Sequence, residues 1–198
     1  MTCLFDQSPA KLAQLAQEYT FVGGQLVTPL TRYSLAPAVA FAVDNGAYSG
    51  RCGLAEFGDM LARLQVARAR CLFAALPDVV GSARRTLEIF EIAHAQFYRW
   101  PLALVCQDGQ ESLPIPWAQI AAVFIGGSTG WKMSVHAAQI IRAAQVLGRH
   151  VHVGRVNTVA RWRYFEQLGV DTCDGSGLCR FTWMRDAIQA AQGSDHGI

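Results

Sequence analysis

The chain has 198 residues, of which 52% are hydrophobic and 16% are charged, and its formal net charge is +2. This length and composition indicate one domain over residues 1–198 with a sizeable core, and the small net charge excludes a polycation that binds nucleic acid through charge alone. The positive charge comes from 15 arginines and 2 lysines. Because arginine suits bidentate contacts with phosphate, nucleic-acid binding stays open.

The sequence contains no signal for a membrane or for export. There is no run of 18 apolar residues, and the N-terminus MTCLFDQSPAKL lacks the basic-then-apolar order of a signal peptide. We therefore expect a cytoplasmic protein that has no membrane span. The six cysteines form no CxxC pair, so we expect no metal site, and a reducing compartment disfavours disulfides.

Helical and strand patterns alternate along the chain at intervals of roughly 25–35 residues, which is typical of βα units. Ser8 and Pro9 are suited to the N-cap and the first position of an opening helix, AKLAQLAQEY. A short first strand is expected at residues 26–30 and a second strand at 39–44. A helix with one apolar face follows over residues 53–70.

The same alternation continues through the second half of the chain. Apolar runs predict strands at residues 71–78, 102–107, 122–127, 150–156 and 169–174. The expected helices between them cover residues 82–100, 134–148 and 158–169, with Ser134 as an N-cap and Gly148 as a C-cap. The segment 181–192 is expected to form a last short strand or turn and then a helix.

These elements predict a compact α/β protein with seven or eight strands, each followed by a helix. The closest fold class is a TIM-type (β/α)8-like barrel, either complete or trimmed, because about 200 residues is the lower end for eight units. An open, doubly wound sheet is the alternative. In both folds the active site lies at the C-terminal ends of the strands.

Polar residues suited to chemistry follow five of the expected strands. In chain order they are Asp44, Asp78, the pair Gln107 and Asp108, the pair Gly126 and Gly127, and the pair Asp171 and Asp174. Each one taken alone has a structural explanation as a turn or a helix cap. The series points to a site, because parallel strands gather their C-terminal ends around one mouth.

Taken together, these motifs resemble the guanine transglycosylases of the queuine tRNA-ribosyltransferase superfamily, and more closely its DNA-directed branch, deoxypurine-in-DNA protein A. DNGAYSG resembles the family's DSGGFQ loop, PDVVG matches the position of its second base-binding aspartate, and QDG resembles its VQG. FIGGS resembles its GGL loop, and GVDTCDG resembles its GVDxFDC. The matches run in order across residues 39–180.

The resemblance implies a role for each carboxylate. Asp174 would be the nucleophile, which stabilises positive charge at the sugar C1′ and captures that carbon as a covalent ester. Asp44 would be the general acid and base for the departing and incoming bases. An Asx-turn at Asp44 and a simple turn at Asp174 are the structural alternatives.

The resemblance also implies how the base and the DNA are held. Asp78 and Gln107 would bind the polar edge of guanine, Gly126 and Gly127 would offer a backbone N–H, and Tyr48 would stack on the base. Phosphate or DNA contacts are expected from Arg155, Lys132 and Arg180, and supporting roles from Asp171 and His152. The alternative for each of these residues is an ordinary packing or surface role.

Two departures from the tRNA enzymes bear on the substrate. GSGLCRF replaces their PTR segment, and the 24 residues after Asp174 contain no zinc pattern, so a tRNA substrate is disfavoured. In DNGAYSG, the family's Phe-Gln pair becomes Tyr48 and Ser49.

The resemblance therefore implies exchange of guanine in DNA for a 7-deazaguanine, most closely the 7-cyano base. No cofactor is needed, because one glycosidic bond replaces another. The expected partners are DNA and the free base, with a partner subunit or homo-oligomer left open. The resemblance also implies that such base replacement would protect phage or bacterial DNA against nucleases. A purine nucleoside or nucleotide glycosidase, a noncatalytic purine- or partner-binding barrel and an unrelated metalloenzyme are the alternatives.

Overall fold

The computed structural model describes residues 1–47, 50 and 53–194, and its eight parallel strands form a closed barrel in the order β1 to β8. The strands are β1 (Thr2–Phe5), β2 (Val22–Val27), β3 (Phe41–Val43), β4 (Cys71–Ala75), β5 (Leu102–Cys106), β6 (Ala122–Ile125), β7 (His150–Val153) and β8 (Thr172–Cys173). Because β8 pairs with β1 through Thr2 opposite Thr172 and Cys3 opposite Cys173, the sheet closes.

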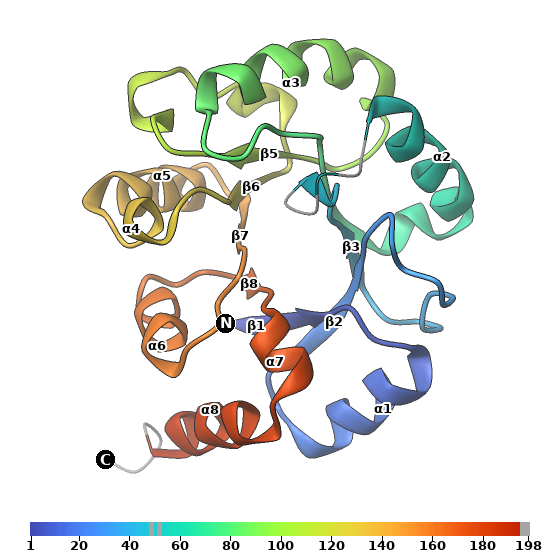
Figure 1. Ribbon diagram of the computed structural model, residues 1–198, viewed down its shortest axis with the longest axis vertical. Helices are drawn as coiled ribbons and strands as arrows, with labels where there is room; N and C mark the ends of the chain where they lie inside the picture. The colour runs from blue at the N-terminus through green and yellow to red at the C-terminus, as the bar shows by residue number, and fades with distance from the viewer. Residues whose placement is uncertain (48–49, 51–52, 195–198) are drawn as a thin grey trace.

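Helices surround the barrel as an outer layer (Figure 1). The α-helices are α1 (Pro9–Glu18), α2 (Leu54–Leu64), α3 (Ala83–Phe97), α4 (Thr129–Lys132), α5 (Val135–Val146), α6 (Val159–Gln167), α7 (Ser176–Arg180) and α8 (Thr182–Ser194). Three 3-10 helices are η2 (Gln65–Arg70), η3 (Gln110–Ser112) and η4 (Trp117–Gln119). Within the described residues, every helix is too short or too polar to cross a membrane.

The predicted barrel is confirmed, and the closed sheet excludes the open, doubly wound alternative and the trimmed form. Several predicted helix boundaries are confirmed as well. The Ser8 side chain accepts a hydrogen bond from the backbone N–H of Lys11, and Ser134 does the same for Ala137 at the start of α5. Gly148 follows α5 in the left-handed region with φ 63°, as a helix-terminating glycine does.

Three segments of the chain differ from what the sequence predicts. The strand β1 was not predicted, because a four-residue apolar run directly before a helix is a weak pattern. The first predicted strand, 26–30, lies four residues earlier as Val22–Val27, where two glycines and the buried Gln25 hide the apolar pattern. The segment 181–192 was expected to begin with a short strand or turn, but only Phe181 precedes helix α8, which begins at Thr182.

Two layers of buried side chains fill the molecule. One cluster contains residues from strands and helices and therefore lies between the sheet and the helices. The other contains strand residues only, with four alanines among larger side chains such as Phe73 and Phe124, and therefore fills the barrel interior. In β7, Val151 and Val153 belong to the outer cluster, whereas the ring of His152 packs against Phe73 and Phe124 inside.

Candidate active site

The C-terminal ends of the strands surround one cavity of about 440 Å³, its open mouth included. Five residues that the sequence singled out line it from five strand ends: Asp44, Asp78, Gln107, Gly126 and Asp174. Arg155, which follows β7, lines it as well. The remaining lining residues are Asn45, Val80, Val105, Phe124 and Gly154. The lining thus combines carboxylate, amide and guanidinium groups with the apolar side chains Val80, Val105 and Phe124, as is typical of small-molecule sites.

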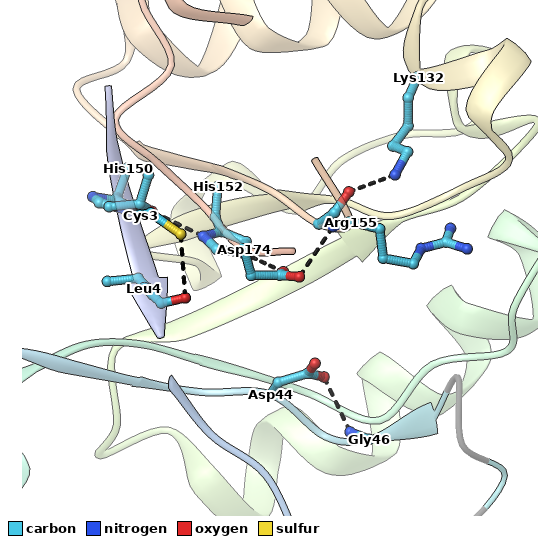
Figure 2. Close-up of polar contacts among 11 residues, drawn as sticks. Cys3, Leu4, Asp44, Gly46, Lys132, His150, His152, Arg155 and Asp174 are labelled. Atoms are coloured by element: carbon cyan, nitrogen blue, oxygen red, sulfur yellow. Dashed lines mark hydrogen bonds and ion pairs between the residues drawn. The ribbon is translucent and has the colours of Figure 1, made fainter. Parts of the chain in front are cut away.

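Asp174 follows β8, and each of its carboxylate oxygens accepts one hydrogen bond. Oδ2 accepts from His152 Nε2 at 3.0 Å, and Oδ1 accepts from the backbone N–H of Arg155 at 3.0 Å. The Asp174 side chain is 15% exposed. Two donors, one in β7 and one just after it, thus fix the carboxylate (Figure 2), which lines the cavity.

A chain of buried hydrogen bonds extends from Asp174 into the barrel. His152 is fully buried, and its Nδ1 lies 2.9 Å from Thr172 Oγ1, which lies 2.8 Å from His150 Nε2. With Asp174 ionised and His152 neutral, one proton arrangement satisfies every bond. His150 donates to Thr172, Thr172 donates to His152, and His152 donates to Asp174. Burial lowers the pKa of His150, which favours its neutral form.

Asp44 follows β3 and faces the cavity from the side opposite Asp174 (Figure 2). Burial raises its pKa to about 7, with further contributions from the negative charges of Asp174, Asp78 and Asp6. The backbone N–H of Gly46 donates to Asp44 Oδ1 at 3.0 Å and opposes that rise. Asp44 is therefore a carboxyl group that exchanges its proton near neutral pH.

Asp78 and Gln107 form a hydrogen-bonded network along one wall of the cavity. Gln107 Nε2 donates to Asp78 Oδ2 at 2.6 Å, and Asn45 Nδ2 donates to Asp78 Oδ1 at 2.9 Å. Gln107 Oε1 accepts from the backbone N–H groups of Gly81 and Gly127. Burial raises the pKa of Asp78, and both side-chain donors oppose that rise. Gln107 therefore orients Asp78 through one hydrogen of Nε2, while Oε1 accepts from the two glycine N–H groups.

Gly126 and Gly127 allow the backbone after β6 to approach this network closely. A Cβ on Gly126 would lie 2.8 Å from Gln107 Nε2, and a Cβ on Gly127, whose φ is 47°, would lie 2.5 Å from the Trp131 ring. The N–H of Gly126 donates to the carbonyl of Cys106, and that of Gly127 donates to Gln107. The expected role of these glycines as N–H donors to a base therefore does not fit, and both serve close packing.

The predicted phosphate-binding residues differ in their placement. Arg155 lines the cavity, and its guanidinium donates to the carbonyl of Gly127. Lys132 is 2% exposed and donates to the carbonyl of Gly154, so the expectation that it binds phosphate does not fit. Arg180 is exposed and lines a second cavity, which shares Asp174 with the first.

Two further predicted residues lie outside this arrangement. Asp171 precedes β8, at the opposite end of the strand from Asp174; its Oδ2 accepts a hydrogen bond from the backbone N–H of Val151 and lies 4.0 Å from His150 Nδ1. Its expected supporting role is thus limited to the β7–β8 edge. Tyr48 falls outside the described residues. Within the described part of the chain, no cluster of three His, Cys, Asp or Glu side chains is arranged to hold a metal ion.

Sequence reasoning gave no role to three polar residues at the barrel mouth. Asp6 follows β1 and accepts hydrogen bonds from Thr31 and Tyr33, but its strand was not predicted. Asn45 was treated as part of a turn, although it is buried and holds Asp78. Asp108 anchors the turn after β6 by accepting two hydrogen bonds from Ser128. The polar residue after each apolar run was the signal, and Asp6 and Asp108 both fit it.

No protein-family profile and no curated protein matches the sequence. Among solved structures, the chain is similar to a protein from Silicibacter pomeroyi DSS-3 described as a glycerophosphoryl diester phosphodiesterase, with 13% identity and a TM-score of 0.48 over 80% of this chain and 52% of that one. It is also similar to the PaMucR phosphodiesterase in complex with c-di-GMP, with 14% identity and a TM-score of 0.42 over 87% of this chain and 66% of that one. The chain thus spans between half and two thirds of the length of these two proteins, and at these scores neither indicates what it binds.

Proposed function

We propose that this chain is a DNA-guanine transglycosylase, which exchanges guanine in DNA for a 7-deazaguanine through a covalent ester on Asp174. The observation that supports this proposal most is the pair of carboxyl groups facing one cavity in different environments. Asp174 is held by two N–H donors, whereas Asp44 is half-buried and its desolvation raises its pKa to about 7. A nucleophile and a proton donor at one site are what glycosidic bond exchange requires.

In the first half of the proposed reaction, an oxygen of Asp174 attacks C1′ of the deoxyribose. The C1′–N9 bond breaks, its electron pair leaves with guanine, and Asp44 gives the departing base a proton. In the second half, N9 of the deazapurine attacks C1′ and displaces Asp174, while Asp44 takes up the proton from N9. Over the two halves, one C1′–N9 bond breaks and another forms, and the proton that Asp44 gave to guanine is replaced by the proton from the deazapurine. Neither water nor a cofactor therefore enters the reaction.

The base would bind along the wall formed by Asp78 and Gln107. Each oxygen of Asp78 accepts one hydrogen bond within the protein, and a carboxylate oxygen can accept a second. Guanine offers N1–H and its 2-amino group as donors to that remaining capacity. Phe124 and Val105 would supply apolar contact to the ring, since both line the same cavity.

The sugar and its phosphates would lie beyond Asp174. The second cavity, of about 670 Å³, is lined by Asp174, Ser176 and Arg180 among others, so Asp174 lines both cavities. A guanine in a duplex would have to leave the base stack to reach this position. If Arg180 and other cations contact phosphates, binding weakens as salt concentration rises.

A label-release assay tests the proposal. DNA carrying radiolabelled guanine is incubated with the protein and unlabelled 7-cyano-7-deazaguanine, and released guanine is counted. We expect release that requires the added base and is lost in Asp174→Asn. Asp59→Asn is the matched control, because Asp59 is an exposed aspartate on α2, and we expect it to retain full exchange.

The other outcomes separate the alternative functions. Guanine release without added base, still dependent on Asp174, would identify a glycosidase in which water replaces the incoming base. Saturable binding of purine or DNA without release, in both single- and double-stranded substrates and at low salt, would indicate a noncatalytic binding protein. Full release by Asp174→Asn would refute its role as nucleophile.

A further inference from the structure

The peptide group between Gly154 and Arg155 connects a buried lysine to the carboxylate of Asp174. Its N–H, on Arg155, donates to Asp174 Oδ1 at 3.0 Å. Its carbonyl, on Gly154, accepts a hydrogen bond from Nζ of Lys132 (Figure 2). Both bonds act on one conjugated amide. A cation at the carbonyl oxygen withdraws electron density from the amide and makes its N–H a stronger donor.

The backbone at this peptide adopts a conformation that needs outside support. Arg155 has φ 61°, which is a left-handed conformation that residues other than glycine seldom adopt. The guanidinium of Arg155 donates to the carbonyl of Gly127 after β6, while Lys132, in α4 after β6, donates to the carbonyl of Gly154 after β7. These reciprocal contacts join the ends of two neighbouring strands and hold the peptide plane.

The environment of Lys132 is costly for a positive charge. The residue is 2% exposed, and burial, followed by the charges of Arg155 and Arg161, lowers its pKa to about 8, whereas Asp174 and Asp108 oppose that change. A methionine of similar length would fill the same space without this cost. The charge therefore serves something other than packing, and the nearest polar group that it contacts leads to Asp174.

We propose that Lys132 is a positioning residue for Asp174, acting through the Gly154–Arg155 peptide to fix the N–H donor at Oδ1. This positioning role replaces the phosphate-binding role that the sequence suggested for Lys132. The nucleophilic role of Asp174 rests on the proposed function, but the effect of Lys132 on the Arg155 amide does not depend on it.

Nuclear magnetic resonance of the Arg155 amide proton tests the contact without any assay of activity. We expect this signal to move upfield in Lys132→Met, because the donor weakens, and to move less in Lys132→Gln, which keeps an uncharged donor. The chain contains one other lysine, Lys11, whose Nζ bonds to Gln14 on the surface. Lys11→Met should leave the Arg155 signal unchanged.

An unchanged Arg155 signal in a folded Lys132→Met variant would overturn the proposal. If both Lys132 variants fail to fold, a pH titration of the wild-type protein tests the proposal instead. Raising the pH through the midpoint at which the Lys132 side-chain signals titrate should move the Arg155 amide with that same midpoint. An Arg155 amide that follows another group's midpoint, or that does not move, would also overturn it.

Kinetics distinguish positioning from phosphate binding. Weakening one of the two donors to Asp174 should lower kcat for base exchange about tenfold in Lys132→Met, with KM for DNA unchanged. A raised KM and a smaller salt dependence with kcat unchanged would indicate a phosphate contact and refute positioning. Absence of exchange in the wild-type protein would instead refute the proposed function, and the amide signal would still decide the role of Lys132.

Discussion

Replacing Asp44 by asparagine should stabilise the folded protein increasingly as pH rises from 5 to 7. The folded-state pKa of Asp44 is raised from 3.8 to about 7, so between these values the unfolded chain ionises while the folded protein keeps its proton. The raised pKa therefore gives stability that is present below pH 4 and lost as pH rises to 7. At about 1.4 kcal/mol per unit, the loss approaches about 4 kcal/mol above pH 7. The Asp44→Asn variant does not lose this stability, because its amide never ionises and the amide oxygen can still accept a hydrogen bond from the N–H of Gly46.

Urea denaturation of the wild type and Asp44→Asn at several pH values measures this effect. The difference in the free energy of unfolding should grow by about 2 kcal/mol or more between pH 5 and pH 7.5, at a constant m-value. The exposed Asp59→Asn variant should show no such growth. A difference that stays flat across this range would refute the argument that Asp44 is neutral in the folded protein at pH 6.

Three other substitutions have definite expected outcomes. Gln107→Leu leaves Asp78 and two backbone N–H groups without their partner and should lower the free energy of unfolding by about 2–4 kcal/mol in urea titration; a loss below about 1 kcal/mol would contradict the network. Gly127→Ala, at φ 47° and with its Cβ 2.5 Å from Trp131, should lower the melting temperature measured by calorimetry, and an unchanged value would contradict the packing argument. Thr172→Val, which breaks the link between His152 and His150, should reduce kcat for base exchange about tenfold, whereas Thr172→Ser should retain it; equal effects would contradict the hydrogen-bonded chain.

The barrel could be predicted because its pattern repeats along the chain. Strands such as Leu102–Cys106 and Ala122–Ile125 are buried on both faces, so they appear as continuous apolar runs followed by polar strand ends. The strand Val22–Val27 is not a continuous apolar run, because it contains Gln25. The buried amide of Gln25 is hydrogen-bonded to the backbone of Gln7, Ser34 and Ala36. Those partners come from loops, and the linear pattern contains no trace of them.

The site was predictable in its membership but less so in its contacts. Parallel strands necessarily bring Asp44, Asp78, Gln107 and Asp174 to one end of the barrel, so spacing sufficed to group them. Which atoms pair depends on the three-dimensional register. The sequence alone therefore could not predict that Gln107 hydrogen-bonds to Asp78 and to the N–H groups of two glycines.

The burial of Lys132 is a further case. Its position one turn into a short helix resembles that of an exposed cation, and the carbonyl that accepts from it belongs to another strand end, 22 residues away. The sequence shows that Lys132 is charged, but its hydrogen bond to the Gly154 carbonyl depends on the pairing of β6 with β7.

The covalent intermediate on Asp174 is the central claim, and intact-protein mass spectrometry tests it most directly. The protein is mixed with a short guanine-containing DNA in the absence of deazapurine and quenched with acid. The account predicts a species whose mass equals protein plus DNA minus guanine, with the attachment mapped to Asp174 and absent from Asp174→Asn. Exchange of labelled guanine by the same preparation with no such species, or an attachment mapped to another residue, would contradict it.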